Sequence, residues 1–222
     1  MPKEVPVDLR NNSSAETVFR RKNSDLIAKL AKETLFNERE VTQLAVLHKK
    51  ISSTRGPLTR QVFRDVFHGG LDFTENLRHL LIDRIYGHFN KTNKLKLPIE
   101  HWVSGLSTIF RAPLPDKTKF AYKIYDLMRS NKITKEQMFP MLRGCMIKLP
   151  PEDDADETVR DMIDLLLKSL DVDRDGEISY EDFSSVVLDN YDLYLESMGP
   201  VFPSREAAHA FMTTFTDELN KF

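Results

Sequence analysis

The chain has 222 residues, and its 32 basic and 34 acidic side chains give a formal net charge of −2 at pH 7. This near-balance provides no global attraction to nucleic acid or to an anionic membrane, so we expect neither as a partner. The single cysteine, Cys145, excludes an internal disulfide and fits a reducing compartment. There is no apolar run of the roughly 18 residues that a membrane span needs, and no secretory signal pattern, so we expect a cytoplasmic protein.

The N-terminal residues 1–23 are polar and lack hydrophobic periodicity, and we expect them to form a flexible tail. Beyond them, apolar residues recur every three or four positions, which predicts helices almost throughout. Asn37 followed by Glu40 resembles a capping box at a helix start. We therefore expect an all-α fold that begins with a helical lobe over residues 24–111.

A proline-containing segment, RAPLPDK at residues 111–117, interrupts the helical pattern and marks the predicted boundary between two lobes. The second lobe is expected over residues 116–199. Within it, a helix predicted over residues 134–146 contains Pro140 and is expected to kink, and the acidic run LPPEDDADE is interpreted as a solvated connection rather than a metal site. An amphipathic helix is expected over residues 204–222. Its apolar stripe comprises Ala208, Phe211, Phe215, Leu219 and Phe222.

The segment DVDRDGEISYED, Asp171 to Asp182, has the pattern of an EF-hand calcium loop. Such a loop needs oxygen ligands at positions 1, 3, 5, 7, 9 and 12 and a glycine at position 6. Gly176 takes the glycine position, and Ile178 at position 8 is expected to form a short strand that pairs with a neighbouring loop. The predicted ligands are the side chains of Asp171, Asp173, Asp175 and Asp182 and the backbone carbonyl of Glu177, with Ser179 acting directly or through water.

Asp182 closes this loop where a glutamate usually provides two oxygens. The shorter aspartate reaches one oxygen more easily than two, which favours six-coordinate Mg²⁺ relative to seven-coordinate Ca²⁺. We expect one divalent site with reduced calcium affinity, and the residues leave open whether Ca²⁺ or Mg²⁺ occupies it.

Two earlier windows have the same length but have lost their acids. DLMRSNKITKEQ at residues 126–137 keeps one carboxylate, Asp126, and NKTNKLKLPIEH at residues 90–101 keeps none among its first six positions, so we expect neither to bind an ion. The lysines of the earlier window are open to two interpretations. They either contact an acidic partner, such as a tubulin tail or a dynein segment, or are soluble replacements in an inactive loop. The lysines are Lys91, Lys94 and Lys96.

The sequences around the three windows resemble the calaxin family of EF-hand proteins from motile cilia. The resemblance is carried by HWVSGLSTIFR, KEQMFPML and LDVDRDGEISYEDF followed by LYLESMGP, and extends from about Leu30 to Phe215. It implies an N-terminal EF-hand lobe in which a degenerate helix pair precedes the first hand, with its loop at residues 90–101. It also implies a C-terminal lobe made of the second and third hands, with loops at residues 126–137 and 171–182.

For function, the resemblance implies a non-enzymatic subunit attached to the docking complex of the outer dynein arm in the axoneme of cilia or sperm flagella. The implied partners are docking-complex coiled-coil proteins, with the outer-arm dynein heavy chain and the doublet microtubule as further candidates. The alternative is a soluble calcium-switched subunit of an enzyme, like the calcineurin-B-type proteins or the neuronal calcium sensors. An enzyme is not expected, because the sequence has no phosphate-binding GxxxxGK loop, no HExxH and no GxSxG.

Overall fold

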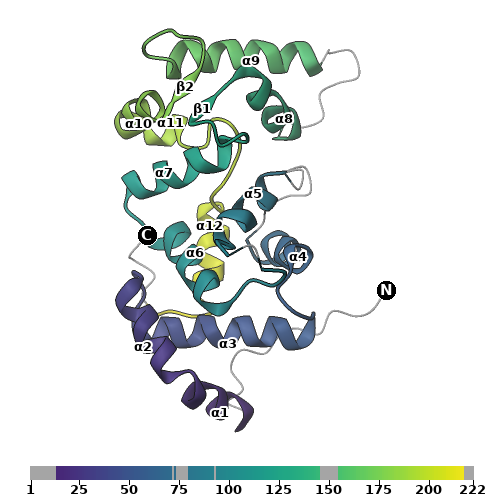
Figure 1. The fold of residues 1–222 in the computed structure, drawn as a ribbon, viewed down its shortest axis with the longest axis vertical. Coiled ribbons are helices and arrows are strands. Elements are labelled where there is room, and N and C mark those ends of the chain that lie inside the picture. The colour runs from purple at the N-terminus through teal and green to yellow at the C-terminus, as the bar shows by residue number, and fades with distance from the viewer. Residues whose placement is uncertain (1–13, 72, 74–79, 93, 146–154, 218–222) are drawn as a thin grey trace. The chain divides into compact units, whose positions relative to one another are not determined.

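The computed structural model describes residues 14–71, 73, 80–92, 94–145 and 155–217. These residues form helices with one short pair of strands, so the predicted all-α EF-hand fold is confirmed (Figure 1). None of the described helices is both long and apolar enough to cross a membrane. The helices are α1 Ser14–Lys22, α2 Ser24–Glu33, α3 Glu38–Thr54, α4 Arg60–Leu71, α5 Leu80–Phe89, α6 Ile99–Arg111, α7 Leu114–Tyr125, α8 Lys135–Cys145, α9 Ala155–Leu170, α10 Tyr180–Asp189, α11 Tyr191–Tyr194 and α12 Arg205–Met212, and the strands are β1 Lys132–Ile133 and β2 Ile178–Ser179.

The contacts divide the chain into two units that do not follow a simple linear order. The first unit consists of residues 1–71, 89–111 and 204–222, and the second consists of residues 72–88 and 112–203. This grouping differs from the predicted lobes, because most of α5 joins the second unit and the C-terminal segment joins the first. The difference arises from tertiary contacts: α12 packs on α4, and Arg84 of α5 hydrogen-bonds to the end of α7.

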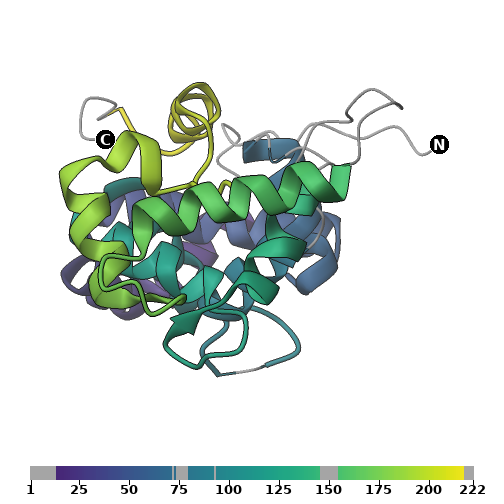
Figure 2. The same ribbon diagram turned by 90° about the horizontal axis from the view of Figure 1, so that it is seen from above.

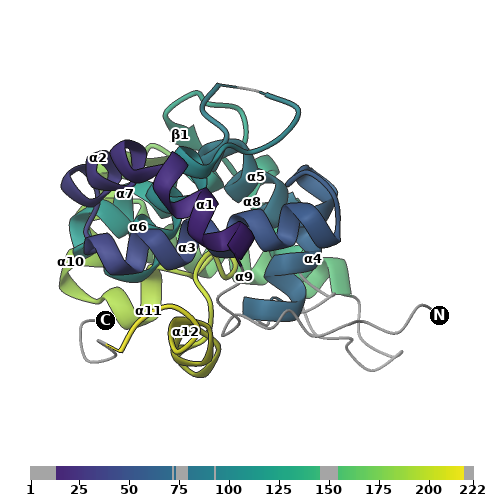
Figure 3. The same cartoon turned by 90° about the horizontal axis from the view of Figure 1, so that it is seen from below.

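Part of the predicted flexible tail is helical, which corrects the prediction for residues 14–22. Helix α1 packs on α3, where Lys50 Nζ lies 2.6 Å from Glu16 Oε1 and the Lys49 ammonium lies 5.1 Å from the Phe19 ring centroid (Figure 3). A nine-residue helix is marginal alone, so these contacts with α3 supply the stability that the local pattern does not reveal. The preceding residues 1–13 lie outside the described part.

The first unit has an aromatic core that includes the C-terminal segment. The capping box of Asn37 and Glu40 is present at the start of α3, as predicted. The Phe110 and Phe211 rings stack with centroids 5.5 Å apart, and the edge of Phe215 meets Phe36 at 5.6 Å. The stripe is therefore buried as far as Phe215. Helix α12 ends at Met212, earlier than predicted, and Leu219 and Phe222 lie outside the described residues.

The second unit contains two helix-loop-helix hands joined by their loops. Strands β1 and β2 pair antiparallel with Ile133 opposite Ile178, which confirms the strand expected at position 8 of the third loop. Both isoleucines are fully buried. Helix α9 packs beside α8, and α10 beside α7 (Figures 1 and 2). Pro140 lies inside α8, as predicted, whereas the acidic connection before Ala155 lies mostly outside the described residues.

Candidate metal centre

The loop between α9 and α10 is held in a tight turn by its own aspartates. The backbone N–H of Gly176 donates to Asp171 Oδ2 at 2.9 Å, and that of Asp175 donates to Asp173 Oδ1 at 3.2 Å. The N–H of Glu177 donates to Asp175 Oδ1 at 2.8 Å. Gly176 has φ +89°, a left-handed conformation that glycine adopts without steric cost. These hydrogen bonds bring the carboxylates at positions 1, 3 and 5 to one side of the turn.

The three aspartates fit a hard divalent cation. Their ligand oxygens all lie within 4.8 Å of one another. Asp171 Oδ1 is buried and accepts no hydrogen bond in the described structure. A buried charged oxygen without a partner is costly, and Ca²⁺ or Mg²⁺ would satisfy it because both ions prefer oxygen ligands. Asp171, Asp173 and Asp175 are therefore the residues that would hold the ion.

The other two predicted ligands have additional roles. The Glu177 carboxylate lies 2.5 Å from Lys132 Nζ, which leaves its backbone carbonyl as the ligand expected at position 7. Asp182 forms a capping box with Ser179, in which Asp182 Oδ2 accepts hydrogen bonds from the Ser179 N–H and hydroxyl. With Oδ2 used in this way, Oδ1 is the oxygen that Asp182 can offer to an ion. The complete ligand set stays a prediction.

The second hand keeps its loop shape through hydrogen bonds in place of an ion. Asp126 accepts from the N–H of Ser130 at 3.0 Å and from the N–H of Asn131 at 2.8 Å, one to each carboxylate oxygen. At position 12, Gln137 accepts from the Leu127 N–H at 2.9 Å and donates to the carbonyl of Lys132 at 3.1 Å. The position-7 carbonyl thus has a hydrogen-bond donor where an active loop would have a cation. A glutamine at position 12 is the sequence signal for this closure, because its amide both donates and accepts.

Arg84 reinforces the second hand from outside its sequence. Its guanidinium donates to the carbonyls of Lys123 at 2.9 Å and Ile124 at 3.1 Å. It also donates to the carbonyl of Asp126 at 2.5 Å. The last carbonyls of a helix have no partner within the helix, so Arg84 caps the C-terminus of α7 at the entrance of the loop. This role was not predicted from the sequence, because Arg84 precedes the loop by about 40 positions.

The first window is also closed by its own side chains. Asn90 Nδ2 donates to the carbonyl of Lys94 at 2.6 Å, and Asn90 Oδ1 accepts from the Lys94 N–H at 3.2 Å. Leu97 N–H donates to the carbonyl of Leu58 at 2.8 Å, so the loop is joined to the preceding helix pair. Lys91, Lys94 and Lys96 are exposed. At position 12, burial lowers the pKa of His101, which disfavours a further positive charge there.

Known proteins match this arrangement of hands. Residues 116–188 match the family model described as an EF-hand domain pair. Calaxin of Xenopus laevis is 31% identical over 206 residues, which cover 90% of this chain and 96% of that protein. Calaxin of Danio rerio is 35% identical over 152 residues, which cover 68% of this chain and 70% of that protein. The chain belongs to the calaxin family.

Membership of the calaxin family confirms the resemblance inferred from the sequence, and the EF-hand domain pair makes this a calcium-binding EF-hand protein. A more distant similarity exists to the calcineurin B protein of Candida glabrata, at 25% identity over 166 residues that cover 74% of this chain and 89% of that protein. Within this calaxin-family chain, the matched pair includes the hydrogen-bonded second loop and the candidate metal loop.

Proposed function

We propose that this protein is a non-enzymatic EF-hand subunit of the ciliary or flagellar axoneme. In this role it associates with the docking complex of the outer dynein arm and supports or regulates dynein-driven motility. The proposal rests on calaxin-family membership together with one observation: a single loop has converging carboxylates with an unsatisfied buried oxygen, Asp171 Oδ1, among the residues that the structure describes. Such a protein acts by binding partners, and its one ion site is where calcium would enter the response.

The two closed loops support a mainly structural role for most of the molecule. Since Asp126 and Gln137 hold the second loop, and Asn90 holds the first, neither loop needs an ion to keep its shape. An ion at the third loop would connect the end of α9 to the start of α10 through Asp171 and Asp182. Any calcium response is therefore expected to be local to this loop and its two helices. The one oxygen available from Asp182 favours six ligands, so Mg²⁺ is the expected competitor.

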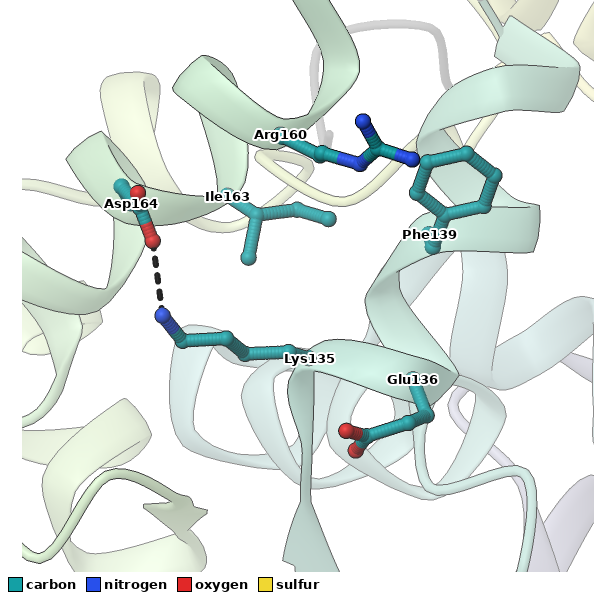
Figure 4. Close-up of a pocket in the computed structure, with 6 residues that line it drawn as sticks. All are labelled: Lys135, Glu136, Phe139, Arg160, Ile163 and Asp164. Atoms are coloured by element: carbon teal, nitrogen blue, oxygen red, sulfur yellow. Dashed lines mark hydrogen bonds and ion pairs between the residues drawn. The ribbon is translucent and has the colours of Figure 1, made fainter. Parts of the chain in front are cut away.

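A pocket of about 470 Å³ in the second unit is the surface at which we would test for a coiled-coil partner. It lies between α8 and α9, and Figure 4 shows the Lys135–Asp164 ion pair at one end and Arg160 beside Phe139 at the other. Apolar surface from Phe139 and Ile163, bordered by charges of both signs, suits the amphipathic face of a coiled-coil helix. Loss of docking-complex binding by Phe139→Ser, with unchanged ion binding, would support this use of the pocket.

Fractionation of axonemes tests the proposed role directly. The tagged protein should remain with salt-washed axonemes of ciliated or sperm cells and should be lost when the docking complex is absent. The Asp171→Ala variant should still reach the axoneme, because the closed loops and apolar cores do not depend on the ion. A protein that is diffuse in the cytoplasm and absent from washed axonemes would refute the axonemal role.

A second candidate function is a calcium-switched subunit of an enzyme, which the distant similarity to calcineurin B favours. In that case the C-terminal stripe would leave its site when calcium binds. The stripe is buried within the first unit, where Phe211 and Phe215 contact Phe110. Hydrogen exchange of residues 205–216 should show less protection with calcium if this function is correct. Equal protection with and without calcium would exclude this switch.

A further inference from the structure

Lys132 occupies a fixed position in the inactive second loop, at position 7 of that window. Its backbone is held from two sides, because it pairs with Ser179 in the strand ladder and its carbonyl accepts a hydrogen bond from Gln137. The hydrogen-bonded second loop therefore serves as a rigid support for this side chain. The side chain itself is directed toward the third loop.

The Lys132 ammonium contacts two acidic residues of the candidate metal loop. Its Nζ lies 3.1 Å from Asp175 Oδ2 and 2.5 Å from Glu177 Oε2. All three side chains are partly exposed, between 36% and 49%, so these ion pairs add little to folding stability. Their larger consequence is for the ion, since Asp175 is one of the three aspartates whose oxygens converge.

We propose that Lys132 is a tethered competing cation, through which the inactive second hand sets the divalent-ion affinity of the third hand. The inference depends on the divalent site of the proposed function and adds the residue that tunes it. Without an ion, Lys132 neutralises Asp175 and Glu177. When an ion binds, Asp175 must be shared with it, and a positive charge remains beside a doubly charged cation.

The expected size of the effect follows from Coulomb's law. A single charge about 6 Å from a divalent ion in water-like surroundings opposes binding enough to weaken affinity by roughly tenfold, and side-chain movement and salt reduce this. We therefore expect Lys132→Gln to bind calcium about three- to tenfold more tightly than the wild type. The difference should shrink as the salt concentration rises, because partly exposed charges are screened.

Lys135→Gln is the matched control. It removes the same charge from the same unit, but Lys135 Nζ pairs with Asp164 at 2.7 Å, outside the loop, and both side chains are exposed. Calorimetric calcium titrations of the full chain should give a tighter constant for Lys132→Gln and an unchanged one for Lys135→Gln. An equal affinity in the wild type and both variants would overturn the inference while leaving the divalent site intact.

Other outcomes separate the inference from the site itself. Binding by Lys132→Gln but not by the wild type would support the tethered cation and refute an occupied site in the native protein. Absence of binding in both would overturn both ideas.

Carbodiimide crosslinking provides a readout that does not depend on affinity. In the presence of a chelator, mass spectrometry should detect a Lys132–Asp175 amide crosslink, and saturating calcium should reduce its yield. The Lys135–Asp164 crosslink should stay constant and serves as the internal control. A Lys132–Asp175 yield that does not respond to calcium, in a protein that binds calcium, would contradict competition at Asp175.

Discussion

Glu40 anchors the C-terminal segment inside the first unit, and its replacement by glutamine should strongly destabilise that unit. The side chain is only 3% exposed. Glu40 Oε1 accepts hydrogen bonds from Arg111 Nη2 at 2.8 Å and from the Thr216 hydroxyl at 2.6 Å, while Oε2 accepts from the Asn37 N–H at 2.9 Å. One carboxylate thus joins the start of α3, the end of α6 and the segment after α12.

The expected cost of Glu40→Gln is about 3 kcal/mol in the free energy of unfolding. Glutamine keeps the shape and one acceptor, but the Arg111 side chain, 5% exposed, loses its counter-charge. Removing one partner of a buried ion pair costs about 3–5 kcal/mol, and the retained acceptor places the value near the lower end. With a urea m value of about 2 kcal/mol/M, the midpoint should fall by roughly 1.5 M.

Urea unfolding followed by circular dichroism measures this shift, and Arg39→Ala is its control. Arg39 also contacts the segment after α12, at 3.1 Å from Asp217, but both side chains are more than three-quarters exposed. An exposed pair contributes less than about 1 kcal/mol. The double variant Glu40→Gln, Arg111→Met should cost less than the sum of the single changes, because no buried charge is left. A Glu40→Gln shift no larger than that of Arg39→Ala would refute the buried-pair argument.

Three further predictions concern the ion, the core and pH. Asp182→Glu should raise calcium affinity about tenfold in a calorimetric titration with millimolar Mg²⁺, because glutamate offers a second oxygen and retains the capping box; no change would show that Asp182 does not limit affinity. Gly105→Ala should destabilise the protein by about 3 kcal/mol or more in urea, because an added Cβ would overlap the Phe89 ring, whereas Gly87→Ala, with open space around it, should be neutral or stabilising; equal effects would refute this packing. Burial raises the pKa of Glu196, so the stability that its protonated form contributes is complete below the unfolded-state pKa near 4.5 and is lost as pH rises through the folded-state pKa; Glu196→Gln should therefore be more stable than the wild type at pH 7 but not at pH 4, and a difference that is independent of pH would contradict this.

The metal loop was predictable from the sequence because its geometry is local. Asp171, Asp173 and Asp175 are two residues apart, and a glycine turn brings their oxygens together whatever the rest of the chain does. The capping boxes at Asn37 and Ser179 were also within reach of sequence reasoning, since each involves residues three positions apart. The box at Asn37 was predicted and is confirmed, whereas the box at Ser179 was missed because Asp182 was considered only as a ligand.

The inactive second loop shows a limit of counting ligands. The absence of acids argues against an ion, but it does not indicate what replaces the ion. Gln137 and Asp126 close the loop through residues at most ten positions away, so this closure was readable from donor and acceptor types.

Spacings of a few residues were enough to establish the helical class, the family and the loop with convergent carboxylates. The distant groups that meet these elements became visible only in the folded chain. Lys132 reaches Asp175 across 43 positions, Arg84 reaches the end of α7 across about 40, and Thr216 reaches Glu40 across 176. Such contacts depend on how helices pack and on which strands pair, and short-range periodicity carries no information about either.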